Sequence, residues 1–170
     1  EFTTRAWNYV LRRGKVRRVT LRLNRMSEDL LLLGPNDLNA QLVKKLELGK
    51  GLDQILVEHV RAAYAKNQRI NTRAVLQRVY DSESTKVAGA IAFGTFLSLD
   101  GLQEAAYGYF TEAGTELSKK TATFEYFDAY LSVNPKQAKK EIDDLLANPS
   151  KNSNSFNLQV ISAAIKYQYI

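Results

Sequence analysis

The sequence predicts an all-α protein, and two observations support this fold class. Apolar residues recur every three or four positions through most of the chain, which is the spacing of one face of an α-helix. Between these stretches stand short runs of Gly, Asn, Asp, Ser and Pro that are typical of turns. Helices joined by short links pair as antiparallel hairpins. We therefore expect antiparallel helical hairpins stacked as a short α-solenoid over 35–170, preceded by a basic helical N-terminal arm over 1–34.

The arm is expected to contain two helices. Trp7, Val10 and Leu11 predict a short helix that Gly14 ends. After it, six apolar residues separated by three or four positions form one stripe: Val16, Val19, Leu23, Met26, Leu30 and Leu33. Basic residues fall largely on the opposite side, at Lys15, Arg18, Arg22 and Arg25. A strand over 19–24, where apolar and polar residues alternate, is the competing interpretation, and the longer pattern favours the helix.

From Gly34 onward the apolar spacing predicts shorter helices. Asp37 and Thr72 are expected to cap two of them, and Pro135 suits the first turn of another because its missing amide hydrogen costs nothing there. Polar turns are expected over 67–71, 81–85 and 148–154. The expected helices cover 38–46, 52–64, 72–80, 86–99, 102–113, 119–131, 135–147 and 155–169.

Positive charge is concentrated near one end of the chain. Residues 1–26 contain seven Arg and one Lys against a single acid, Glu1. Because the whole chain has 24 basic and 18 acidic residues, the remainder holds sixteen basic and seventeen acidic residues and is almost neutral. Such asymmetry indicates a polyanionic partner, either nucleic acid or an anionic membrane surface.

We expect the basic arm to bind RNA phosphates, because guanidinium groups match phosphate in bidentate geometry. The residues predicted to make these contacts are Arg12, Arg13, Lys15, Arg17, Arg18, Arg22 and Arg25. Trp7 and Tyr9 can stack on bases, although a packing role beside Val10 and Leu11 is the more ordinary one for Trp7. The alternatives are a solvated helix face or a targeting segment. An Arg-rich, acid-poor start also resembles a mitochondrial transit peptide, so we expect a reducing compartment inside the cell, the mitochondrial matrix in particular.

The remaining composition argues against several kinds of chemistry. The chain has no Cys and a single His, His59, for which a structural role is expected. The acids Glu141, Asp143 and Asp144 suit a solvated face better than a metal site, and 49–51 resembles a phosphate loop only superficially. No apolar run approaches the length of a membrane span. We expect no catalytic residues, no metal, no cofactor and no small-molecule substrate.

Aromatic residues gather in the second half of the chain, at Tyr107, Tyr109, Phe110, Phe124, Tyr126, Phe127 and Tyr130. Aromatic side chains at helical spacing are typical of a core. A concave peptide-binding groove is the other interpretation.

Small and aromatic residues between 90 and 113 follow a pattern that resembles the tetratricopeptide repeat. Gly94, Gly101, Ala106, Phe110 and Ala113 fall on the small, turn, small, aromatic and small positions of that repeat. A second stretch over 121–149 keeps Ala138, Ile142 and Leu145 but makes its turn with Asn134 and Pro135. The related pentatricopeptide repeat, an RNA-binding helical pair, tolerates much of this pattern too. Either resemblance implies a binding scaffold without enzymatic activity.

We therefore expect a non-enzymatic scaffold or structural protein of a larger assembly, anchored on RNA by its basic arm, with protein neighbours on the helical array. An organellar, mitochondrial ribonucleoprotein or ribosome component is the expected setting. The alternative is a tetratricopeptide-like adaptor for protein–protein interaction that does not bind nucleic acid.

Overall fold

The computed structural model describes residues 51–67 and 69–168, and these residues confirm the all-α class. Within those ranges the backbone forms eight α-helices and two short 3-10 turns, with no strand. The chain divides into two compact units, Glu1–Val75 and Leu76–Ile170. The predicted division after residue 34 and the expected helices before residue 51 lie outside the described residues and stay predictions.

Helix α5, Leu52–Ala65, belongs to the first unit, and its inward residues include Ile55, Leu56 and Val60. Gly51 precedes it as the N-cap. Asn67 turns the chain after α5 in a left-handed conformation, with φ of 60°. Helix α6, Arg69–Asp81, then begins three residues earlier than expected. The predicted cap at Thr72 is therefore wrong, because Thr72 lies buried inside α6.

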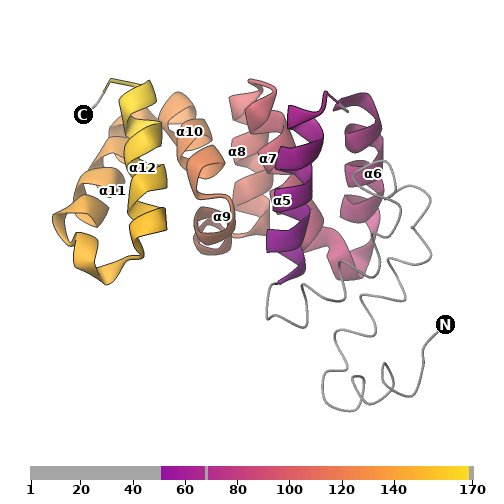
Figure 1. The fold of residues 1–170 in the computed structure, drawn as a ribbon, viewed down its shortest axis with the longest axis horizontal. Helices are drawn as coiled ribbons and strands as arrows, with labels where there is room; N and C mark the ends of the chain where they lie inside the picture. Colours follow the sequence, from indigo (N-terminus) through magenta and orange to yellow (C-terminus); the bar gives the residue numbers. More distant parts are fainter. Residues whose placement is uncertain (1–50, 68, 169–170) are drawn as a thin grey trace, which may run out of the picture. The chain divides into compact units, whose positions relative to one another are not determined.

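The second unit begins with the last turns of α6 and continues to the C-terminal helix (Figure 1). Its elements are the 3-10 turn η2 (Glu83–Thr85), α7 (Lys86–Leu99), α8 (Gln103–Ala113), α9 (Thr115–Thr121), α10 (Thr123–Val133), α11 (Pro135–Ala147), the 3-10 turn η3 (Pro149–Lys151) and α12 (Asn154–Lys166). Two of these helices start at side-chain caps. Asn134 accepts a hydrogen bond from the amide of Gln137, and Ser153 accepts one from the amide of Phe156.

Helices α7 and α10 form the core of this unit. Every residue of α7 from Gly89 to Ser98 is buried, and so is every residue of α10 from Glu125 to Leu131. A helix that is buried on all sides must have neighbours on all sides. Helix α10 has them, because it packs against α7, α8, α9, α11 and α12.

The expected helix over 119–131 is wrong in one respect, because the structure breaks it into α9 and α10. The break falls at the buried Ala122, whose φ and ψ are −124° and 58°. In a continuous helix the carbonyl of Lys119 would accept from the amide of Thr123, but here the Thr123 hydroxyl donates to it at 2.7 Å. A second hydroxyl, that of Ser118, donates to the carbonyl of Phe110 at 2.8 Å. The Phe110 carbonyl also accepts from the amide of Gly114 at 3.1 Å, so the Ser118 hydroxyl adds a second bond there. Side-chain bonds of this local kind are typical of Ser and Thr.

Candidate functional site

The predicted RNA-binding residues lie outside the described residues. Arg12, Arg13, Lys15, Arg17, Arg18, Arg22 and Arg25 all fall within residues 1–50. Their role therefore remains a prediction from the sequence. The surfaces that the structure does describe belong to the helices after residue 50.

The residues assigned to repeat packing lie where α7 and α8 meet. A Cβ added to Gly94 would lie 2.7 Å from Cε1 of Phe110, so only a hydrogen fits between this helix and the buried ring. Ala106 is also fully buried on α8, and Ala113, at the end of that helix, is half-buried. Gly101 takes φ of 83° in the turn between the helices, a conformation that L side chains rarely adopt.

The aromatic residues mainly fill the core rather than line a groove. Phe110, Tyr126, Phe127 and Tyr130 are buried, while Tyr107, Tyr109 and Phe124 are half-buried. The rings of Tyr107 and Tyr130 stack with centroids 5.2 Å apart, which joins α8 to α10. Burial, assisted by the nearby Tyr107 and Glu141, raises the pKa of the Tyr126 hydroxyl well above its usual value. Tyr126 therefore stays neutral, and the aromatic rings contribute packing between helices.

One buried cation lies beside this aromatic cluster. Lys119 of α9 is only 9% exposed, and its Nζ lies 3.0 Å from Oε2 of Glu141 on α11 and 3.1 Å from Oε1 of Glu116. Burial lowers the pKa of Lys119, but the two carboxylates outweigh that effect, so the pKa lies above its ordinary value. The expected solvated role is therefore wrong for Glu141, which is half-buried and ties α11 to α9.

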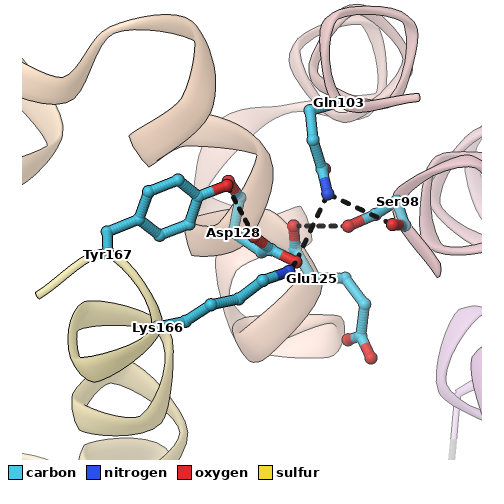
Figure 2. A network of polar contacts seen from close by, with 6 residues as sticks. All are labelled: Ser98, Gln103, Glu125, Asp128, Lys166 and Tyr167. Atoms are coloured by element: carbon cyan, nitrogen blue, oxygen red, sulfur yellow. Dashed lines mark hydrogen bonds and ion pairs between the residues drawn. The ribbon is translucent and has the colours of Figure 1, made fainter. Parts of the chain in front are cut away.

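An extensive polar cluster surrounds Asp128 on α10, a residue that is 3% exposed (Figure 2). Its Oδ2 accepts from Nζ of Lys166 at 2.8 Å and from Nε2 of Gln103 at 3.3 Å, and its Oδ1 accepts from the hydroxyl of Tyr167 at 2.8 Å. The same hydroxyl lies 3.0 Å from the Asp128 carbonyl. A buried carboxylate needs several hydrogen bonds or a counter-charge, because its removal from water is otherwise costly. The cluster thus fastens the end of α12 and the start of α8 to the central helix.

Two further contacts extend the Asp128 cluster towards α7. Gln103 Nε2 also donates to the carbonyl of Ser98 at 3.2 Å, and the Ser98 hydroxyl donates to the carbonyl of Glu125 at 3.3 Å (Figure 2). The network therefore connects α7, α8, α10 and α12 through side chains that mostly point inward. These contacts explain how the four helices dock. The hydrogen-bond donors around Asp128 all come from its own chain.

A surface hollow of about 670 Å³ lies next to this network. It is lined by Gly101, Leu102, Gln103, Glu104, Ala105 and Ser132. The first turn of α8, which has no side-chain cap, contributes Gln103, Glu104 and Ala105 to this lining. The Oε1 of Gln103 is a buried acceptor without a hydrogen-bond partner. The half-exposed Leu102 gives this hollow an apolar side chain, which suits contact with an apolar residue of a polypeptide.

Two other residues considered in the sequence, His59 and Asp143, have environments typical of structural side chains. His59 is buried in α5 among apolar neighbours, and the exposed Asp143 lies 3.5 Å from Nζ of Lys139 on the same helix. Within 51–67 and 69–168, no group of His, Asp and Glu side chains is arranged to hold a metal ion. None of the helices in those ranges has the length and apolar character needed to cross a membrane.

Sequence reasoning missed Asp128, Lys166 and Tyr167 as a connected group. A signal for Asp128 was present, since it lies four residues after Phe124 and three before Leu131, on the apolar side of its helix. An acid in such a position must be neutralised or hydrogen-bonded. Nothing in the spacing identified its partner, because Lys166 is 38 residues away.

A scan against family models, a search of curated proteins and a search of solved structures each found no match for this chain. Any functional conclusion must therefore come from the chain's own charges, contacts and surfaces.

Proposed function

We propose that this chain is a non-enzymatic scaffold protein of a larger assembly, anchored on RNA by its basic N-terminal arm. The observation that carries the proposal is the charge distribution: seven Arg and one Lys against one acid in residues 1–26, on an otherwise neutral chain. Arginine-rich segments bind phosphates and release condensed counterions. An organellar ribonucleoprotein, such as a mitochondrial ribosome, is the setting that this composition favours.

The helices after residue 75 would form a short α-solenoid of stacked hairpins similar to tetratricopeptide repeats. Three observations support that arrangement. Helices α7 and α8 pack together across a link of three residues, 100–102. Gly94 and Phe110 make the close approach within that pair, and α10 then packs against both helices. An array of this kind offers its outer surfaces to protein neighbours.

The buried charges support a scaffold role as well. Lys119 and Asp128 each form an ion pair with a residue of another helix, so their charges stabilise the packing between helices. A scaffold needs this kind of rigidity, because it positions one partner relative to another.

The RNA anchor is tested by the salt dependence of binding. If about five arm residues meet phosphates of single-stranded RNA, log affinity should fall with log salt at a slope of about −3.5. Replacing Arg17, Arg18, Arg22 and Arg25 by Glu should weaken binding at low salt and flatten that slope. Fluorescence anisotropy with a labelled single-stranded RNA measures both quantities.

A matched control changes the net charge by the same amount elsewhere. Lys120, Lys136, Lys140 and Lys151 are all exposed, and their replacement by Glu should leave most of the slope intact. If the arm variant binds as wild type does, or if both variants lose binding equally, the arm does not anchor this protein on RNA.

The second candidate function is a protein–protein adaptor that does not bind nucleic acid. The hollow lined by Gln103 favours it, because the exposed Leu102 at its edge suits contact with an apolar residue of a bound polypeptide. Under this alternative, a Leu102→Asp variant would lose protein partners in affinity purification while the arm variant would retain them. The RNA-anchored scaffold predicts loss of the particle from the arm variant and after nuclease treatment.

A further inference from the structure

The outward face of α12 has large apolar side chains that are exposed and regularly spaced. Leu158 is 63% exposed and Ile165 is 56% exposed. Together with the exposed Ser155 and Ser162 they form a row with intervals of three, four and three residues. We call these four residues the α12 seam. This spacing is the one that helices use to pack along each other in coiled coils.

The opposite face of α12 is apolar too. Val160, Ala163 and Ala164 are buried where the helix packs on α10 and α11. The outward face therefore differs from the inward one in leaving two large apolar side chains, Leu158 and Ile165, in contact with water.

The order of large and small residues indicates which partner fits. When two copies of the seam are placed antiparallel about a twofold axis beside position 160, Leu158 of one copy faces Ser162 of the other. Ser155 likewise faces Ile165. Every large side chain then meets a small one, so that knobs fall opposite holes without overpacking. A surface that complements itself under a twofold rotation is the requirement for an isologous dimer.

The charges agree with self-pairing. Residues 152–165 contain no Asp, Glu, Lys or Arg, so two copies would bring no like charges together at the seam. Depletion of charged residues is typical of the centre of protein interfaces. The nearest cation, Lys166, is already bound to Asp128 of its own chain.

We infer that the α12 seam pairs with the same seam of a second copy of this chain, antiparallel, about a twofold axis near position 160. One helix face buries less than the roughly 1,200 Å² of total surface that a stable interface needs. The dimer is therefore weak, with a dissociation constant on the order of 100 µM.

Sedimentation velocity of the full chain tests the pairing. The experiment covers about 10 µM to 1 mM protein, after nuclease treatment and at high salt, so that RNA bridging does not contribute. Wild type should shift from monomer to dimer across this range. Leu158→Glu and Ser162→Glu should each raise the dissociation constant at least about tenfold, because each puts two charges, one from each copy, into an apolar contact where they lose water.

Leu117→Glu is the matched control, since Leu117 is an exposed leucine on α9, away from the seam. It should dimerise as wild type does. Wild type that remains monomeric at 1 mM, or dimers that survive both seam variants, would overturn the inference. If the seam binds a different partner instead, wild type will remain monomeric at 1 mM.

The register is tested by cysteine cross-linking, which this chain permits because it has no native Cys. An equimolar mixture of the Leu158→Cys and Ser162→Cys proteins should form mixed disulfide dimers under mild oxidation. These should exceed the dimers that either protein forms alone. If the mixed dimers do not exceed the sum of the two symmetrical dimers, the antiparallel register is wrong.

Discussion

The Nζ of Lys166 lies 2.8 Å from Oδ2 of Asp128, and the two ends of this ion pair differ sharply in exposure. The lysine side chain is 53% exposed, whereas the aspartate side chain is 5% exposed. Loss of the aspartate would release a lysine that water can solvate. Loss of the lysine would leave a buried carboxylate with neutral donors from Tyr167 and Gln103.

This difference predicts an asymmetric response to mutation. Lys166→Met should lower the free energy of unfolding by about 2–4 kcal/mol, because a buried charge loses its counter-charge. Asp128→Asn should cost less, about 1–2 kcal/mol. The double variant should be more stable than the sum of the two losses implies, and urea unfolding of all four proteins measures this cycle.

Lys139→Met is the control for that cycle. Lys139 pairs with Asp143 at 3.5 Å, and both side chains are about half exposed. Its loss should cost no more than about 0.5 kcal/mol. If Lys166→Met and Asp128→Asn lower the free energy of unfolding equally, and the double variant lowers it by their sum, the role assigned to the buried carboxylate is contradicted.

Two helical glycines should respond in opposite directions to replacement by alanine. At Gly94 the new Cβ would lie 2.7 and 2.8 Å from ring atoms of the buried Phe110, so overpacking should lower stability by about 1–3 kcal/mol. At Gly108 on α8 nothing lies within 4 Å of the new Cβ. There alanine should raise stability by about 0.5–1 kcal/mol, because it loses less conformational freedom in a helix. Chemical unfolding of both variants provides the comparison, and a stabilised Gly94→Ala protein would show that α7 and α8 can separate at no cost.

The tyrosines and Lys119 predict a loss of stability in alkaline solution. A hydrogen bond to Glu112 raises the pKa of Tyr80 to about 12, and burial raises the pKa of Tyr126 and of Tyr130. Lys119 also has a raised pKa. Each group holds its proton in the folded state at a pH where the unfolded chain has lost it. Their contribution is therefore complete below about pH 10 and declines as the pH rises through the folded values.

Tyrosinate absorbance during an alkaline titration checks this expectation. Tyr80, Tyr126 and Tyr130 should ionise only above pH 10, as the helical circular dichroism signal is lost. Tyr126→Phe should reduce the slope of unfolding free energy against pH above pH 10. Ionisation of all nine tyrosines near pH 10 with the helices intact would refute the protection of these groups.

Helix positions were predictable because they depend on local spacing. Expected helices over 52–64, 86–99, 102–113 and 135–147 agree with α5, α7, α8 and α11 to within one residue at each end. The errors occurred where a local signal competed with packing. Thr72 is a good cap residue, yet it lies buried inside α6. The apolar spacing continued through Ala122, although the helix breaks there and the Thr123 hydroxyl donates to the Lys119 carbonyl.

The polar contacts between helices were not predictable from spacing. Glu141 was expected on a solvated face, since it stands beside other charged residues in the sequence. Its ion pair with Lys119 depends on how α9 and α11 meet, which local spacing does not reveal. The close approach at Gly94, by contrast, was readable from the sequence because a small residue within an apolar helix has few other uses.

The central position of α10 affects how this unit can unfold. In many repeat proteins an end unit peels away while the rest stays folded, because each unit contacts only its neighbours. Here α10 packs on every helix from α7 to α12. Fragments cut on either side of residues 123–133 would therefore leave apolar surface uncovered on both pieces, and limited proteolysis should yield either the whole unit or small peptides.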